Sequence, residues 1–586
     1  MAPIELDRKL VPVNLQIASQ PVRVSNDLDD EGHLHRRKDL VKMYQHPPGD
    51  FPESQMFERP KFDARAEAVK KYKGDKERNE HIEKTGNIVG VIGQAGIGKT
   101  TSMKKWVKRV LNGEMLLRVS FLFFILVRNL DFSKQMNLLE FLVSTVIQDW
   151  EHDDETDRKW LKSIYHNKNV LIALDGLDEA AVESLTIKAP KVNLYKPNKP
   201  IHFLLNLLSG TLLPFAKVVV SSRPNQLYHL HPDHRPKFVL QILGLDEVGQ
   251  NDLGHQICLD RYSKVKGILV KNADAFAYCY VPVNFILTVD YLMNFENEVE
   301  FVCMTQILAS SCERYSVSSH LRSKACNLDK LCHLAWLGFQ QIQIIFESEH
   351  LELADLDDNT MQAFLTTSVV KSANIKTTIM EGHKRSYFSH LIWQEFFAAM
   401  YLMLFASETK FDEALNYLFD DRWEIVSKFL FGLCNYEVYQ QLKCVTPAPS
   451  DKLRKVKKSK LKNAAIANLE KRYGCQCKDE TSEYVDWKEL WQICSWIHEA
   501  NNRDVAMDLV ACFPKRIIIP RDTTLLPNDL TNFLYSLQKV QKPPTIAIDQ
   551  SPFTGELLRR LCASVADSNI IVSIVSVKVF RQLWIG

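Results

Sequence analysis

A glycine-rich loop lies between a short apolar run and a helical pattern. It follows the apolar run Ile88–Ile92 and matches the pattern G-x-x-x-x-G-K-[ST]. Glycines allow such a loop to close around a phosphate with its N–H groups pointing inward, and the helix N-terminus adds partial positive charge. We therefore predict a polyphosphate site, with the Lys99 ammonium on the β- and γ-phosphates and the Thr100 hydroxyl on Mg²⁺. The expected binding residues are Gly93, Gln94, Ala95, Gly96, Ile97, Gly98, Lys99, Thr100 and Thr101.

Three carboxylates follow a second apolar run about 75 residues later. Asp175 ends the run Val170–Leu174, and Asp178 and Glu179 come three and four residues after it. Open α/β sheets bind their ligands at the carboxyl ends of strands, so Asp175 is expected to hold Mg²⁺ directly or through water. Either Asp178 or Glu179 would orient or deprotonate the water that attacks the γ-phosphate. These three residues are the predicted catalytic group, and Thr100 and Asp175 are the predicted metal ligands.

An arginine at the end of a third apolar run adds a positive charge. Arg223 follows Val218–Ser221, from where it could sense the γ-phosphate. The nearest approach to the guanine-reading pattern N-K-x-D is Asn167–Val170, where the aspartate is missing. Guanine is therefore disfavoured, and ATP/ADP with Mg²⁺ is the predicted cofactor.

The elements that must position these residues form an α/β domain. Five short apolar runs alternate with helical patterns, as strands of a parallel sheet covered on both faces do. After residue 250, Leu, Phe, Trp and Ala recur at helical spacing, which predicts a mainly helical second half. The five runs are Ile88–Ile92, Phe121–Val127, Val170–Leu174, Val218–Ser221 and Phe238–Leu243.

Composition excludes several classes of protein. The chain has 586 residues and a formal net charge of +2, so charge indicates neither nucleic acid nor an anionic membrane as a partner. Its start lacks a signal-peptide pattern, and its most apolar early stretch spans seven residues, too few for a transmembrane segment. We expect a cytoplasmic chain whose 13 cysteines are reduced, with Cys475 and Cys477 as weak evidence for metal.

The basic run Lys452–Lys462 is interpreted as a solvated helix face or loop.

These motifs together resemble those of the NACHT family of P-loop ATPases, the nucleotide-binding core of NOD-like receptors. The resemblance rests on the loop at 93–100, on DGLDE at 175–179, and on the stretch 204–224 that leads to Arg223. Farther on, VPVN at 281–284 is similar to the segment whose proline packs against adenine. FSHLIWQEFFAA at 388–399 is similar to the signature of the family's winged-helix domain. The resemblance implies that Pro282 contacts adenine and that His390 contacts the ADP β-phosphate in a closed state.

The resemblance also implies an architecture. The expected fold is an AAA+-like P-loop domain with a parallel five-stranded sheet, followed by an all-helical half that includes a winged-helix domain. The expected domains are an extended leader (1–80), the NACHT domain (81–250), helical domain 1 (251–322), the winged-helix domain (323–410), helical domain 2 (411–545) and the start of a leucine-rich repeat segment (546–586).

The function implied is an innate immune or cell-death signalling switch. ADP would hold the chain closed, exchange for ATP would promote homo-oligomerisation, and slow ATP hydrolysis would reset the switch. Its partners would be the nucleotide, further copies of the chain, an unidentified upstream ligand and a downstream adaptor. A catalytic P-loop kinase or ATPase and a nucleotide-binding scaffold without turnover are the alternatives.

Overall fold

The computed structural model describes the following parts of the chain: residues 16–21, 88–94, 96–114, 119–132, 134–144, 153–180, 185–223, 226–227, 230–236, 238–293, 301–318, 328–341, 343–356, 360–361, 364–371, 382–443, 451–473, 487–513, 516–519, 527–539, 545–548 and 572–574. Ala95, Cys475, Cys477 and most of the leader lie outside them.

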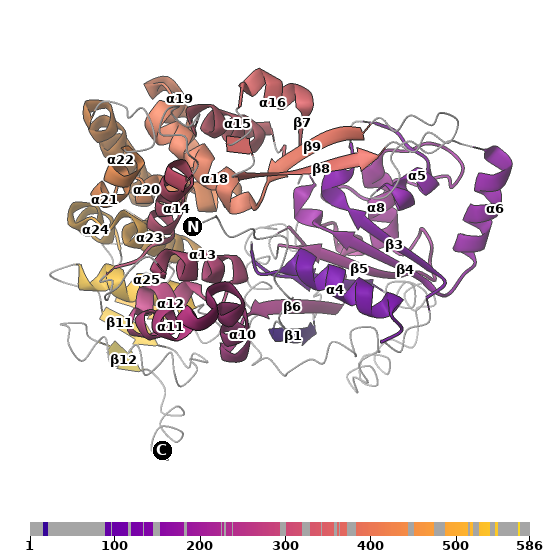
Figure 1. The fold of residues 1–586 in the computed structure, drawn as a ribbon, viewed down its shortest axis with the longest axis horizontal. Helices are drawn as coiled ribbons and strands as arrows, with labels where there is room; N and C mark the ends of the chain where they lie inside the picture. The colour runs from indigo at the N-terminus through magenta and orange to yellow at the C-terminus, as the bar shows by residue number, and fades with distance from the viewer. Residues whose placement is uncertain are drawn as a thin grey trace, which may run out of the picture.

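The first half is built on a parallel sheet, as predicted (Figure 1). Its strand order is β6-β2-β5-β4-β3, so the strand before the glycine-rich loop is flanked on both sides. One strand was not predicted: β1 (Gln16–Pro21), from the leader, pairs antiparallel with β6 and extends the sheet to six strands. The parallel strands are β2 (Ile88–Ile92), β3 (Phe121–Leu126), β4 (Val170–Asp175), β5 (Lys217–Ser222) and β6 (Phe238–Gly244).

Each face of the sheet has its own apolar core because side chains alternate along a strand. On β2, Ile88 and Ile92 face a core that includes residues of α5 (Leu138–Val143) and α8 (Pro200–Leu208). Val89 and Val91 face the opposite core, which includes Met103 and Trp106 of α4 (Lys99–Leu111). The helix α6 (Asp154–Tyr165) also contributes to the first core. The helix that starts at Lys99 is thus held against the sheet by its own buried side chains.

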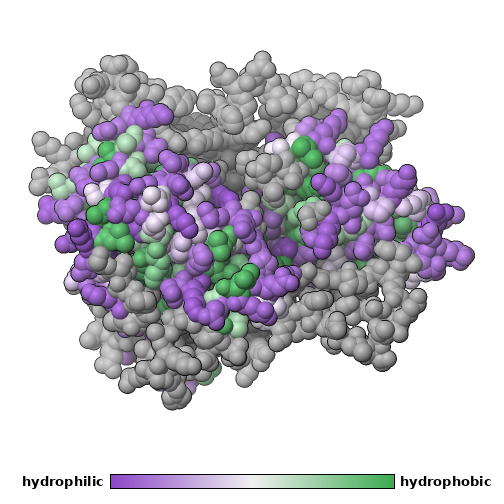
Figure 2. All heavy atoms as spheres, turned by 90° about the horizontal axis from the view of Figure 1, so that it is seen from above, coloured by the Kyte–Doolittle hydropathy of each residue, from purple (hydrophilic) through white to green (hydrophobic). Residues whose placement is uncertain are grey.

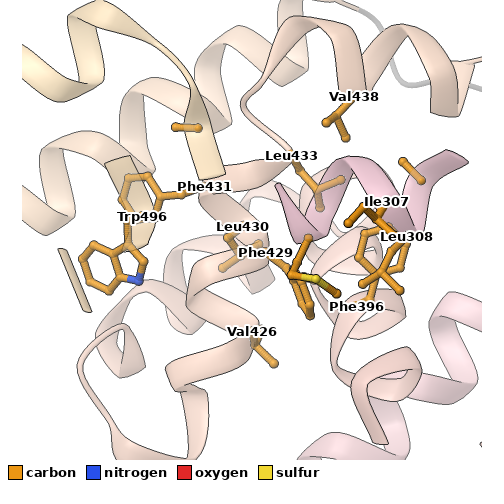
Figure 3. Close-up of a cluster of buried hydrophobic side chains, with 14 of the residues drawn as sticks. Ile307, Leu308, Phe396, Val426, Phe429, Leu430, Phe431, Leu433, Val438 and Trp496 are labelled. Carbon is orange, nitrogen blue, oxygen red and sulfur yellow. The ribbon is translucent and has the colours of Figure 1, made fainter. Parts of the chain in front are cut away.

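The second half forms one large helical core. Figure 3 shows Phe429 and Leu430 of α20 beside Phe396 of α18 and Leu308 of α14, with Trp496 of α23 against Phe431. The helices are α10 (Glu247–Cys258), α11 (Tyr262–Lys271), α12 (Ala273–Tyr278), α13 (Pro282–Leu292), α14 (Met304–Ser318), α15 (Leu328–Gln341), α16 (Ser348–Ala354), α18 (Leu391–Met400), α19 (Glu408–Ala414), α20 (Glu424–Gly432), α21 (Tyr436–Lys443), α22 (Asp451–Tyr473), α23 (Trp487–Ala500), α24 (Arg503–Val510) and α25 (Pro527–Gln538).

Two small sheets correct the expectation that this half is all-helical. An antiparallel sheet of β7 (Phe346–Glu347), β9 (Gly382–Phe388) and β8 (Leu365–Lys371) extends toward the first half (Figure 1). A parallel sheet of β10 (Arg516–Ile519), β11 (Thr545–Ile548) and β12 (Val572–Ile574) lies near the end of the chain. The expected domain boundaries remain predictions, and α10 runs through the one placed at residue 250.

The basic run Lys452–Lys462 lies on α22 and is not simply a solvated face. Arg454 and Lys457 are buried, and Lys457 Nζ donates to the carbonyl oxygens of Leu402 (2.8 Å) and Ala406 (2.6 Å). Leu402 lies in the π-helical turn Tyr401–Phe405 that continues α18, and Ala406 is the C-cap residue of that turn, so a lysine caps the end of the helix. The sequence around the run does not reveal this role, because the partners are backbone oxygens more than 50 residues away.

The surface carries scattered apolar side chains rather than one continuous apolar band on the face seen in Figure 2. The eight cysteines that the structure describes are all free thiols, as expected for them. In the described residues, no helix is both long enough and apolar enough to cross a membrane.

Candidate functional site

The glycine-rich loop has a shape that only glycine allows at two positions. Gly96 and Gly98 have φ angles of 76° and 98°, in the left-handed region. A methyl group on Gly96 would lie 2.2 Å from Val283 Cγ1, so the loop passes directly beneath the start of α13. Gly98 caps the N-terminus of α4, whose first turn carries half-buried Thr100 and exposed Thr101. The loop therefore has the local conformation expected of a phosphate cradle.

Lys99 is folded back onto the loop. Its Nζ donates to the carbonyl oxygens of Gly93 (2.9 Å) and Gln94 (3.1 Å). Burial lowers the pKa of Lys99 below its ordinary value, while the neighbouring Asp178 opposes that shift. The ammonium is thus partly desolvated and held by carbonyl dipoles, and an anion of higher charge would compete well for it.

Asp175 ends β4 with a fully buried carboxylate. Its Oδ1 accepts from Ser221 Oγ at 2.6 Å, and the same hydroxyl accepts from Gly176 N at 2.9 Å. Its Oδ2 has no hydrogen-bond partner although it is buried. Protein Mg²⁺ sites commonly use one or two carboxylates together with water and phosphate oxygens, so this unpartnered oxygen fits a metal-bound water or the ion. Asp175 and Thr100 are the residues that would hold it.

The two acidic residues after Asp175 are each paired with an arginine. Asp178 Oδ2 lies 3.1 Å from Arg223 Nε, and Glu179 Oε1 lies 3.3 Å from Arg128 Nη2. Burial raises the pKa of Glu179 to about 8, although Arg128 partly opposes that shift. Gly176 (φ 87°) makes room for this arrangement, because a methyl group there would lie 2.7 Å from Glu179 Oε2. In this conformation neither carboxylate is free of a cation.

His390 and the start of α13 both reach the glycine-rich loop. A methyl group on Gly96 would lie 3.4 Å from His390 Cε1 and 3.3 Å from Val281 Cγ1. Pro282 is the first residue of α13, between Val281 and Val283, which both contact the loop at Gly96. The structure thus brings together segments that are nearly 300 residues apart in the sequence.

His390 is held as a neutral hydrogen-bond donor. It caps the N-terminus of α18, and its Nδ1 accepts from Ile392 N at 3.1 Å. Burial, together with the positive charges of Arg223 and Lys99, lowers the pKa of His390 to about 4. A neutral imidazole that accepts at Nδ1 carries its proton on Nε2. Nε2–H can therefore donate to an anion at the loop.

Two charged residues of the site were missed by sequence reasoning. Arg128 follows β3, pairs with Glu179, and lies 5.9 Å from the centre of the Tyr387 ring on β9. Glu395 is a buried residue of α18 that lies 3.6 Å from Arg223 Nη2, and burial raises its pKa while Arg223 opposes. Arg128 had a usable signal, since it directly follows a predicted strand at the edge where Asp175 and Arg223 lie. For Glu395 the only sequence signal was its place in the 388–399 pattern.

Comparison with known proteins agrees with this geometry. Residues 87–256 match the family model of the NACHT domain. The chain therefore carries a NACHT domain. Its NACHT domain contains the glycine-rich loop, the acidic group and Arg223, whereas Pro282 and His390 lie beyond the matched residues.

Similar proteins carry NACHT domains within longer chains. The chain is 28% identical to NACHT, LRR and PYD domains-containing protein 1a of Mus musculus, over 62% of this chain and 31% of that protein. It is 25% identical to NACHT, LRR and PYD domains-containing protein 14 of Homo sapiens, over 63% of this chain and 35% of that protein. The chain spans about a third of the length of these relatives. A solved structure of Hsp104:ATPyS with FITC casein aligns with a TM-score of 0.20 and 12% identity, over 87% of this chain and 72% of that one.

Proposed function

We propose that the chain is an ATP/ADP-binding signalling switch of the NOD-like receptor type, held closed by ADP and oligomerising when ATP replaces it. The observation that supports this most strongly is the position of His390. A neutral imidazole at the N-terminus of α18 lies against Gly96 of the glycine-rich loop. A nucleotide phosphate bound in that loop would therefore be contacted from the helical half as well as from the sheet.

The proposed roles follow from the donors and acceptors present. The loop N–H groups and Lys99 would bind the phosphates, Nε2–H of His390 would donate to the β-phosphate, and Pro282 would pack against adenine. Mg²⁺, held by Thr100 and Asp175, would neutralise charge on the phosphates. Arg223 would sense the γ-phosphate from the end of β5.

Arg223 and Arg128 supply the contacts that a switch would change. Arg223 bridges Asp178 beside the sheet and Glu395 on α18, and Arg128 lies between Glu179 and Tyr387 of β9. Moving an equilibrium from 1:99 to 99:1 takes about 5.5 kcal/mol of differential binding. A few charge-assisted hydrogen bonds of about 1.5–3 kcal/mol each are enough for that. A γ-phosphate that draws Arg223 away from Glu395 would weaken the closed state.

The same pairs bear on catalysis. Asp178 or Glu179 is the proposed group that prepares the attacking water, yet both are engaged by arginines in this conformation. Slow hydrolysis that resets the switch fits this arrangement. The pairs also favour a second candidate, a nucleotide-binding scaffold without turnover, and ATP hydrolysis measured over hours on the purified chain separates the two.

The surrounding architecture supports the NOD-like receptor reading. We propose that the antiparallel sheet β7-β9-β8 with α15 and α18 is the winged-helix domain. Arg516 pairs with Thr545 and Ile546 with Val572, so the parallel strands β10–β12 recur every 26 to 29 residues, close to the period of leucine-rich repeats. A cytoplasmic location, an upstream ligand and a downstream adaptor belong to the same proposal.

The first prediction tests nucleotide binding itself. Freshly purified chain is expected to release ADP on denaturation, identified by chromatography. Lys99→Ala should abolish its retention, because the loop then lacks the ammonium that neutralises the phosphates. Lys104→Ala, an exposed lysine of the same helix, is the matched control and should retain ADP. If Lys99→Ala keeps as much ADP as the parent, or if the parent binds no adenine nucleotide when ADP is added, the proposal is wrong.

A further inference from the structure

The Tyr280 hydroxyl makes two hydrogen-bond contacts, one with the glycine-rich loop and one with α25, and the proposed function uses neither of them. Its hydroxyl lies 2.8 Å from Gln94 Oε1 in the glycine-rich loop and 3.1 Å from Asn528 Oδ1 in the first turn of α25. A phenol has one proton, so it can donate to only one of these two oxygens at a time. The two acceptors, more than 430 residues apart in the sequence, therefore compete for the same donor.

The backbone at Tyr280 is firmly positioned against the sheet. Its carbonyl oxygen accepts from Leu245 N at 2.8 Å, directly after β6. Gly244 (φ 106°) allows this approach, because a methyl group there would lie 2.1 Å from the same carbonyl oxygen. Val281 and Val283 then pack on Gly96. The Tyr280 backbone is thus held beside the loop, in the position from which its hydroxyl reaches Gln94.

The helix α25 is attached to the same segment at two points. Tyr278 OH lies 3.5 Å from Asn532 Oδ1, while Tyr280 reaches Asn528. Asn528 and Asn532 are four residues apart and share one face of the helix. Of the two tyrosines, Tyr278 has Asn532 and His498 as hydrogen-bond partners, away from the loop, whereas Tyr280 contacts Gln94. They form a natural pair for comparison.

Lys99 acts on the same loop residue that Tyr280 contacts. The Gln94 carbonyl accepts from Lys99 Nζ at 3.1 Å while its side-chain amide accepts from Tyr280. A phosphate that recruits the Lys99 ammonium removes that restraint on the Gln94 backbone. Gln94 can then turn away from Tyr280, whose proton is left to Asn528.

We propose that Tyr280 is a positioning residue that couples the glycine-rich loop to the first turn of α25. Nucleotide in the loop transfers the Tyr280 hydrogen bond from Gln94 to Asn528 and thereby stabilises the start of α25, which leads toward the parallel sheet β10–β12. This proposal rests on the proposed nucleotide binding. It adds a route by which occupancy reaches the C-terminal part of the chain without passing through His390.

Hydrogen–deuterium exchange of the full chain, free of nucleotide and saturated with ADP, tests the coupling. Amides 531–534 are the first of α25 with partners inside the helix, so they report whether its first turn is formed. A net change of one neutral hydrogen bond corresponds to about a 2- to 10-fold change in exchange rate. We expect ADP to slow exchange there by that factor in the parent. Tyr280→Phe should bind ADP and lose the effect, and Tyr278→Phe should keep it.

Reciprocity supplies a second measurement with a different readout. Coupling between two sites must act equally in both directions. Asn528→Ala removes the competing acceptor and leaves the Tyr280 proton to Gln94, so we expect the ADP dissociation constant to rise by about 2- to 10-fold. In Tyr280→Phe the same Asn528→Ala change should have no effect on ADP affinity.

The outcomes separate this inference from the proposed function. If the parent binds ADP but amides 531–534 do not respond, or if Tyr280→Phe responds like the parent, the coupling is overturned while nucleotide binding stands. An unchanged ADP affinity in Asn528→Ala also overturns it. If the parent binds no ADP, both proposals fail together.

Discussion

The three cationic side chains around the glycine-rich loop already have partners in this conformation. Lys99 binds loop carbonyls, Arg223 lies between Asp178 and Glu395, and Arg128 pairs with Glu179. Bound phosphate would have to compete with these contacts. His390 differs, because it is neutral and its Nε2–H is directed by the bond at Nδ1 rather than by a carboxylate.

The low pKa of His390 should make the stability of the folded chain depend on pH. Its pKa is about 4 in the folded chain, whereas an unfolded histidine has a pKa of about 6.5. Between these values the unfolded chain binds the proton and the folded chain does not. The stability that His390 contributes is therefore complete above about pH 6.5 and is lost as the pH falls toward 4.

Thermal unfolding of the nucleotide-free chain at pH 7 and pH 5 measures this effect. Other groups titrate over the same range, so the parent is compared with His390→Gln, which cannot take up a proton. The fall in Tm between pH 7 and pH 5 should be smaller in the variant. An equal fall in both proteins would mean that His390 is not held neutral.

At the scale of elements, α18 connects the site to the helical core. Its N-terminus lies at the glycine-rich loop through His390, and the π-helical turn at its C-terminal end is capped by Lys457 of α22. Burial lowers the pKa of Lys457 to about 8, and the negative charge of Glu408 opposes this shift only in part. The ammonium instead relies on two carbonyl oxygens and on the Phe411 ring, 5.3 Å away.

Lys457→Met should therefore destabilise the helical half. Two buried carbonyl groups lose their donor, which costs about 1–3 kcal/mol, and relief from burying a charge offsets part of that. Lys455→Met, an exposed change on the same helix, should stay within about 0.5 kcal/mol of the parent. Thermal unfolding of both variants beside the parent provides the test. Equal Tm values for the two would show that the cap contributes nothing.

At the scale of the whole molecule, several contacts join the sheet to the helical half. Three of them are His390 against Gly96, Arg223 to Glu395 and Arg128 to Tyr387. All three converge on one edge of the sheet, where the nucleotide phosphates would bind. If the chain is the switch proposed above, weakening one of these contacts favours an open form that oligomerises.

His390→Leu is the corresponding test on assembly. Leucine cannot cap α18 or donate to a phosphate, so we expect loss of ADP and spontaneous formation of oligomers, measured by size-exclusion chromatography with light scattering. His255→Leu, on the surface of α10, is the control and should remain monomeric. A His390→Leu protein that stays monomeric and ADP-bound like the parent would rule out the proposal that His390 holds the chain closed.

Sequence alone determined the parts whose physics is local. The five apolar runs predicted the five parallel strands, and the loop pattern predicted where the sheet would present its N–H groups and Lys99, because strand periodicity and glycine spacing depend on near neighbours. The sixth strand, Arg128, Glu395, Tyr280 and the buried Lys457 depended on segments far apart in the chain. Only the tertiary structure decided those, because a side chain's partner and the pKa it acquires are set by what packs against it.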